Sequence, residues 1–291
     1  MTKMTRREWN IAACGALAAA LVPRHATAQA KPNSKIKGVQ LGAQSYSFRD
    51  RSLEEAIKGY LAVGLSSCEL WAGHIEPKGL KREELRKWRL TAPLSQFVEI
   101  GNKFKTAGIE LYAFNYSFRD DSTEAEIERG FQMARALGAK CITSSAQVSV
   151  AKRVDVFARK YKMRVGMHNH SNIKPNEFAT PDDFTKALAG NSEYLGINLD
   201  IGHFTAANFD AVDYLSQHHD RVVTLHIKDR KRNQGDNVPF GTGDTPIKAV
   251  LELLLKNKWK IPANIEYEYN GADTVAEVKK CYEFCRAALG A

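Results

Sequence analysis

The 291-residue chain lacks the motifs of several common protein classes. It holds 5 cysteines without a C-x-x-C pair or a zinc-ribbon spacing, which argues against a thiolate metal site. No G-x-G-x-x-G follows the first apolar run, so the dinucleotide-binding fingerprint of a Rossmann domain is absent. No low-complexity linker divides the chain, which favours a single domain. Past residue 28 we expect buried thiols rather than disulfides at Cys68, Cys141, Cys281 and Cys285.

The N-terminal segment has the pattern of a secretory signal. Arg6 and Arg7 precede an apolar run over residues 11–22, and Ala26-Thr27-Ala28 supplies a cleavage site. This run is too short for a membrane helix, and no later run is apolar enough for one. The arginine pair is the twin-arginine signature, which directs folded proteins to export. We therefore expect removal of residues 1–28 and a periplasmic mature protein of residues 29–291 that does not bind a membrane.

The charge of the mature protein suggests no particular partner. The signal segment carries four basic residues and one acidic residue, so its removal lowers the formal charge from +9 to +6. Solubility explains a mildly basic chain as well as an acidic partner does.

Eight β-branched, apolar runs alternate with amphipathic stretches along the mature chain. This alternation predicts a parallel sheet covered by helices, and eight units in about 250 residues favour a closed (β/α)8 TIM barrel of the α/β class. The predicted strands are 38–47, 67–71, 110–115, 141–145, 164–170, 195–200, 222–228 and 263–269.

Helix start and stop signals separate the predicted strands. Ser52 with Glu55, and Thr123 with Glu126, have capping-box spacing. Two further positions predict a capping threonine followed by proline in the first turn; these are Thr180-Pro181 and Thr245-Pro246. Glycines mark three helix ends, at Gly64, Gly108 and Gly138.

Polar side chains gather where the last four predicted strands end. Alternation along a strand puts His168 with His170, and Glu266 with Glu268, on one face. A lone buried histidine is more often a satisfied core residue than a ligand. Four strand ends that each carry an imidazole or carboxylate are different, because buried charges are costly unless paired or bound to metal. A mixed His/Asp/Glu set suits Mn, Fe(II), Co or Zn.

Four motifs carry a family resemblance. The chain resembles the sugar isomerase/epimerase (xylose isomerase-like) barrels at 199–203 (LDIGH), 225–230 (LHIKDR), 241–244 (GTGD) and 265–266 (IE). The resemblance implies one divalent metal ion. Manganese is the first choice, and zinc, cobalt, iron and magnesium are the alternatives. It also implies four metal ligands, which are His168, Asp200, His226 and Glu266. His203 and Arg230 match positions that commonly meet substrate hydroxyls.

One departure from the family pattern concerns the chemistry. In the epimerases, a glutamate ends the fifth barrel strand, and His168 stands at this position here. This replacement weakens the case for a mechanism with two carboxylate bases. The remaining candidates for the catalytic base are Glu266, Glu268, His170 and His203.

The earlier strands supply predicted pocket walls. Trp71 and Tyr112 could stack on a sugar ring, although core packing explains them equally well. Glu69 and His74 are stronger candidates, since charged groups at a strand end are harder to explain by packing. The predicted substrate-binding set is Gln44, Glu69, Trp71, His74, Tyr112, Asn115, Lys228, Asp229 and Arg230.

The resemblance implies enolisation chemistry on a small sugar or keto-glycoside. A metal acidifies the C–H beside a carbonyl, and a base removes the proton. Return of the proton gives a sugar isomerase or epimerase, whereas loss of a β substituent gives a 3-keto-glycoside lyase, and the sequence leaves both open. A non-catalytic sugar-binding barrel is an alternative. An abasic-site endonuclease would need a larger metal cluster than these residues offer. It would also need a nucleic-acid substrate, from which export would separate the protein. A homo-oligomer is left open.

Overall fold

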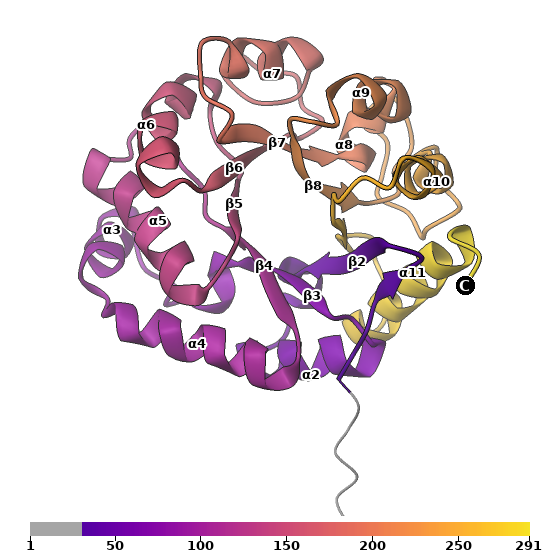
Figure 1. Ribbon diagram of the computed structural model, residues 1–291, viewed down its shortest axis with the longest axis horizontal. Coiled ribbons are helices and arrows are strands. Elements are labelled where there is room, and N and C mark those ends of the chain that lie inside the picture. The colour runs from indigo at the N-terminus through magenta and orange to yellow at the C-terminus, as the bar shows by residue number, and fades with distance from the viewer. Residues whose placement is uncertain (1–30) are drawn as a thin grey trace, which may run out of the picture. The chain divides into compact units, whose positions relative to one another are not determined.

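The computed structural model describes residues 31–291 as a closed barrel of parallel strands inside a ring of helices (Figure 1). Strands β2 to β9 pair in chain order, and β9 closes the barrel by pairing with β2. The predicted single TIM barrel is therefore confirmed. The predicted signal segment and its cleavage site lie outside the described residues. Within residues 31–291, no helix has both the length and the apolar character to cross a membrane.

The eight barrel strands lie where the apolar runs predicted them, and three have the predicted bounds. They are β2 (Val39–Gln44), β3 (Ser67–Trp71), β4 (Glu110–Asn115), β5 (Cys141–Ser144), β6 (Arg164–His168), β7 (Leu195–Asp200), β8 (Val222–Ile227) and β9 (Ala263–Ile265). The last strand ends four residues early because the Tyr267 amide donates to the Ser47 hydroxyl at 2.9 Å, not to a neighbouring strand. The first strand also ends early, where the Gln44 side chain accepts from the Tyr46 amide and caps a 3-10 turn, η1 (Ser45–Phe48).

A short strand that the sequence analysis missed precedes the barrel. Strand β1 (Lys35–Ile36) pairs antiparallel with the start of β2. The reversal between them uses Lys37 and Gly38, which both have positive φ, at 48° and 97°. A two-residue strand is too short to show a periodic pattern.

Helices follow each strand and form the outer ring (Figure 1). They are α2 (Leu53–Val63), α3 (Arg82–Thr91), α4 (Leu94–Ala107), α5 (Glu124–Leu137), α6 (Ala151–Tyr161), α7 (Pro181–Leu188), α8 (Ile201–Ala206), α9 (Ala211–His218), α10 (Ile247–Asn257) and α11 (Thr274–Ala288), with short 3-10 turns η2 (Ala72–His74) and η3 (Val148–Val150). The capping boxes at Ser52 and Thr123 are confirmed, as is the Thr180 cap. Gly64, Gly108 and Gly138 end their helices in the left-handed conformation, as predicted.

The predicted cap at Thr245 is wrong. Helix α10 begins at Ile247, and its N-cap residue is Pro246, without a side-chain cap. The Thr245 hydroxyl instead accepts from the Arg230 amide at 3.0 Å and so ties the end of the loop after β8 to its beginning. The four cysteines of the described chain are buried and carry free thiols, as predicted.

Candidate metal centre and substrate pocket

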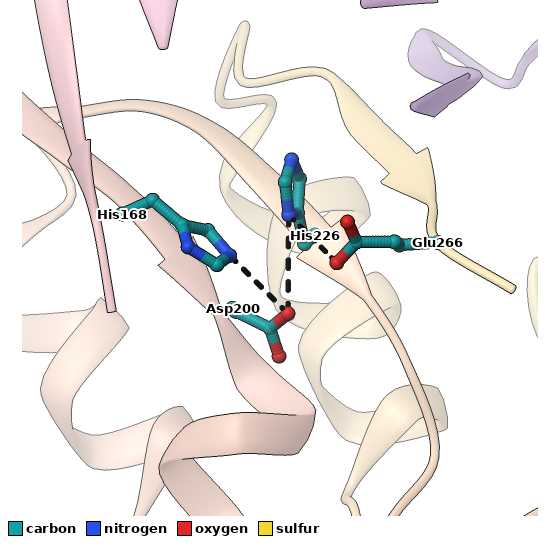
Figure 2. Close-up of side chains that lie close together, drawn as sticks. All are labelled: His168, Asp200, His226 and Glu266. Atoms are coloured by element: carbon teal, nitrogen blue, oxygen red, sulfur yellow. Dashed lines mark ion pairs between the residues drawn. The ribbon is translucent and has the colours of Figure 1, made fainter. Parts of the chain in front are cut away.

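Four side chains from consecutive strands converge at the carboxyl end of the barrel (Figure 2). His168 ends β6, Asp200 ends β7, His226 lies in β8 and Glu266 follows β9. One ligand atom from each lies within 4.8 Å of the others. His168 Nε2 is 3.5 Å from Asp200 Oδ2, and His226 Nδ1 is 3.1 Å from Glu266 Oε2. The four residues named by the family resemblance thus form one cluster, the metal cluster.

The donor atoms of the metal cluster fit a divalent cation. His168 Nε2, Asp200 Oδ2, His226 Nδ1 and Glu266 Oε2 are all buried, and none makes a hydrogen bond of good geometry within residues 31–291. The Lys228 ammonium lies close to the two carboxylate oxygens and offsets part of their charge. Buried polar atoms are normally satisfied, and four that face one another in this way need an explanation. Two imidazole nitrogens and two carboxylate oxygens are the ligands that zinc, manganese and iron accept. A metal ion held by these four atoms would satisfy all of them.

The second oxygen of Asp200 is already engaged. Asp200 Oδ1 accepts from the His203 amide at 2.7 Å and caps α8, which leaves only Oδ2 directed at the cluster. The Asn169 side chain donates to the Asp200 carbonyl and accepts from its amide. The turn from β7 into α8 therefore fixes the carboxylate before any ion binds.

Glu69 orients His226 from the far side of the barrel. Its Oε1 accepts from His226 Nε2 at 2.9 Å and from the Thr143 hydroxyl at 2.6 Å, while Oε2 accepts from Asn264 at 3.0 Å. Glu69 is fully buried and its oxygens are all used. It therefore lies behind a metal-cluster residue and not on the pocket wall where we predicted it. Carboxylates placed in this way fix the tautomer of a ligating histidine and raise its basicity.

Lys228 adds a buried positive charge beside the metal cluster. Its Nζ lies 2.8 Å from Glu266 Oε2, 3.2 Å from Asp200 Oδ2 and 2.5 Å from Glu268 Oε2. Burial alone would lower the pKa of Lys228, but the three carboxylates raise it well above its usual value. Gly202 permits this packing, since a Cβ there would lie 2.7 Å from the Lys228 carbonyl oxygen. The sequence predicted Lys228 to bind substrate but did not reveal this pairing.

A pocket of about 400 Å³ opens above the cluster. It has the size of a small-molecule site and is lined mostly by polar side chains. Four predicted substrate-binding residues lie in its wall, namely Gln44, Trp71, Asn115 and Lys228, as do the base candidates Glu266, Glu268, His170 and His203. Tyr46 also lines it, as do Ser117, Arg119 and Ser145, which were not among the predicted site residues. These three follow β4 and β5, where the polar residues form no recognisable motif.

Comparison with known families agrees with this geometry. The family described as xylose isomerase-like TIM barrel matches residues 62–287. The chain belongs to this family.

Similar proteins include a dehydratase and a sugar-phosphate epimerase. Inosose dehydratase of Lactiplantibacillus plantarum is 28% identical over 123 residues, a match of 36% of this chain and 40% of that protein. An L-ribulose-5-phosphate 3-epimerase of Shigella boydii is 22% identical over 247 residues, or 78% of this chain and 86% of the epimerase. The match to the dehydratase thus spans about two fifths of its length.

Solved structures share the fold. The IolI protein with a bound zinc atom superposes with a TM-score of 0.67 at 16% identity, covering 87% of this chain and 98% of that one. The 3-keto-D-glucoside 4-epimerase YcjR of E. coli gives 0.63 at 15% identity, covering 86% and 99%. At these identities the likeness shows the fold alone.

Three other predicted substrate-binding residues have their polar atoms bonded within the protein. Both ring nitrogens of His74 are occupied, one by the Ser45 hydroxyl at 2.9 Å and one by the Phe48 carbonyl at 3.2 Å. The Tyr112 hydroxyl donates to the Val223 carbonyl inside the barrel at 3.2 Å. Asp229 accepts from the amides of Gly241 and Gly243 and so shapes the loop after β8. None of the three lines the pocket above the cluster.

Arg230 is also removed from that pocket and acts on His203. Its guanidinium lies 2.7 Å from His203 Nδ1 and donates to the Ser171 hydroxyl and the Gly235 carbonyl. Lys228 Nζ lies 3.0 Å from the other ring nitrogen. Burial and the Lys228 charge lower the pKa of His203 well below its usual value, so the ring is neutral.

His170 is the freer of the two neutral imidazoles. Its side chain reaches the open mouth of the pocket, and its ring lies 4.9 Å from that of His168. The surrounding protein desolvates the ring, and the neighbouring His168 and Lys228 add to this, which lowers the pKa of His170 to about 4. At neutral pH the imidazole is therefore uncharged and able to accept a proton.

Proposed function

We propose that this protein is a metal-dependent lyase that eliminates a substituent from a keto-sugar such as a 3-keto-glycoside. The observation that carries the proposal is the set of four buried, converging ligand atoms below a polar pocket that also holds Glu268 and His170. A bound divalent ion would supply the electrophile that acidifies the C–H next to the substrate carbonyl. The inosose dehydratase among the similar proteins supports an elimination, whereas the sugar epimerase supports the alternative given below.

The chain supplies the groups for the proton transfer. Glu268 or His170 would take the proton from C2 of the sugar ring. The C2–H electron pair would then form the C1–C2 double bond as the C1–O bond breaks, and the departing oxygen would take up a proton. The Lys228 ammonium, held between Glu266 and Glu268, would stabilise negative charge that develops on the carbonyl oxygen.

The runner-up is a sugar epimerase. Glu268 follows β9 and His170 follows β6, three strands apart around the barrel, and both line the pocket. Two bases on different walls could exchange protons on two faces of a ring, even though His168 replaces the usual glutamate. An elimination needs one base to take the proton, whereas epimerisation needs both.

The test is turnover in D2O by the metal-loaded protein and its Glu268→Gln and His170→Gln variants. With phenyl 3-keto-β-D-glucoside, we expect the C2–H signal in the proton NMR spectrum to disappear as phenol appears. One variant should lose roughly 10²–10⁴-fold in kcat while keeping its metal, and the other should not. If both variants are inactive and deuterium enters an inverted ring without phenol release, the protein is an epimerase. Passage of the original hydrogen to a neighbouring carbon would indicate an isomerase that uses a hydride shift. A protein that keeps its metal but turns over no substrate would be a sugar-binding barrel.

We also propose that the protein is exported to the periplasm by the twin-arginine route. The support is the sequence of residues 1–28 alone. Replacement of Arg6 and Arg7 with lysine should leave the precursor in the cytoplasm, which fractionation and immunoblotting would detect. Processing that continues unchanged in this variant would indicate the general secretory route.

A further inference from the structure

A second cavity joins the pocket above the metal cluster. This side cavity has a volume of about 230 Å³ and lies between the end of β3, helix α3 and the segment after β4. It shares four lining residues with the main pocket, which are Trp71, Asn115, Ser117 and Arg119. The two spaces therefore adjoin at these four residues, and a ligand seated in the main pocket has only these side chains to pass to reach the side cavity.

The wall of the side cavity carries three arginines and one carboxylate. The carboxylate of Glu76 is neutralised by Arg89, which donates to both of its oxygens at 2.7 and 3.1 Å. Arg82 pairs with Glu126 and Asp121, which do not line the cavity. The net charge of the lining is therefore positive, and the positive charge without a paired carboxylate is that of Arg119.

Arg119 has no carboxylate partner among residues 31–291, although two aspartates follow it directly. Asp120 accepts from the Ser149 hydroxyl and from the Asn176 amide group. Asp121 pairs with Arg82 and Arg86. Both acids are therefore occupied by other groups, and within the described part of the chain the exposed Arg119 side chain remains a free cation where the two cavities meet.

We propose that the side cavity binds the substituent of the substrate that departs from the sugar ring, and that Arg119 selects a substituent carrying an anionic group, a carboxylate or a phosphate ester. A guanidinium presents paired donors that match the oxygens of either anion. The inference rests on the proposed function only in placing the reacting ring beside the metal cluster. Arg119 would be a specificity residue and would take no part in the proton transfer.

The first experiment measures binding without chemistry. Calorimetry with the metal-loaded protein would compare phenyl β-D-glucoside with its 4-carboxy and 4-phosphate derivatives. We expect at least one charged probe to bind more tightly than the neutral one by roughly 1.4-fold to fivefold, the range for a single exposed ion pair. The tighter of the two charged probes identifies the anion. The advantage should shrink as salt is added.

The variants are Arg119→Ala, Arg119→Lys and Lys87→Ala. The alanine at 119 should abolish the preference for charge, and the lysine should retain part of it. Lys87 is an exposed cation on α3 that does not line the side cavity, so Lys87→Ala removes the same charge nearby and should change nothing. Equal binding of the neutral and charged probes, no binding of any probe, or a preference that survives in Arg119→Ala would overturn the proposal.

The second experiment separates this inference from the proposed chemistry. The 3-keto forms of the same glucosides would be given to the wild type and to Arg119→Ala. We expect the wild type to release phenol from the charged substrate with the higher kcat/KM. Arg119→Ala should lose this preference. Charge-dependent binding without any turnover would leave the side-cavity assignment standing and remove the lyase.

Discussion

Strands β6 to β9 and strands β2 to β5 use their polar ends differently. Strands β6 to β9 direct imidazoles and carboxylates at one point, where four ligand atoms lie within 4.8 Å of one another. In the half that strands β2 to β5 form, Glu69, His74 and Tyr112 bond to other protein groups, while Gln44, Trp71 and Asn115 form pocket wall. One half of the barrel mouth thus holds the reactive groups, and the other half supports and shapes them. A polar residue at a strand end marks the site, but its hydrogen-bond partners decide what it does there.

The strongest way to break this comparison is to remove the metal cluster. Asp200→Ala and His226→Ala should each lower the metal content from about one divalent ion per chain to nearly none, because each removes one of four ligands. Metal analysis of the purified proteins is the measurement. His74→Ala, which removes an imidazole from the other half, should keep its ion. Full occupancy in both cluster variants would show that the ion is held elsewhere.

A smaller effect is expected where the two halves meet. Glu69→Gln should weaken metal binding roughly 10- to 100-fold, because the amide no longer holds His226 as a carboxylate does. Competition with a chelator measures the change. Tyr112→Phe removes a different hydrogen bond between the two halves, from β4 to the Val223 carbonyl of β8, and should leave metal affinity unchanged. An unaltered affinity in Glu69→Gln would leave Glu69 with a packing role only.

The protonation state of the cluster gives a third test. Burial lowers the pKa of His226, but the carboxylates of Glu69 and Glu266 outweigh this and raise the pKa well above its usual value. The metal-free ring is therefore protonated at neutral pH and must lose a proton before Nδ1 can bind an ion. For Asp200 and Glu266, nearby cations outweigh burial and lower the pKa values, so both are already ionised.

We therefore expect about one proton to be released per ion bound near pH 7, and affinity to fall roughly tenfold per pH unit as acidity increases. Calorimetry in buffers of different ionisation enthalpy counts the protons. Binding without proton release would mean that the His226 ring is already neutral. In Glu69→Gln the release should be smaller, because one of the two stabilising carboxylates is gone.

The smallest expected effect is on stability, and it should be equal in both halves of the barrel. Thr123 and Thr180 cap helices on opposite sides of the comparison, and each replacement with alanine should cost about 1 kcal/mol in the free energy of unfolding. Urea denaturation of the metal-free proteins provides the measurement. Ser216→Ala removes an exposed hydroxyl that bonds within α9 and should cost close to nothing. A much larger loss for Thr180→Ala than for Thr123→Ala would mean that α7 supports the site as well as the fold.

The sequence predicted the barrel well because its signals are local. Apolar runs and capping residues act over a few positions, so the strands and most helix starts followed from them. The polar ends of adjacent parallel strands predicted a metal site, and the family resemblance named its four ligands. The role of Glu69 depends on a partner 157 positions away, which appears only when the barrel closes. Thr245 failed as a cap for a related reason, since its hydroxyl bonds to the Arg230 amide, 15 residues earlier. Arg119 follows a strand without any motif, and its importance depends on which neighbouring acids are already paired.

The bond between Glu69 and His226 also sets an order of events. The orienting carboxylate comes from the second barrel strand and the last cluster residue, Glu266, from the final one, so the complete site exists only after almost the whole chain has been synthesised and β9 has joined β2. Tight binding of the ion is thus a late step that requires the closed barrel. In a chain that crosses the membrane already folded, as proposed, the ion would be acquired before the crossing, from the metals of the compartment in which the barrel closes.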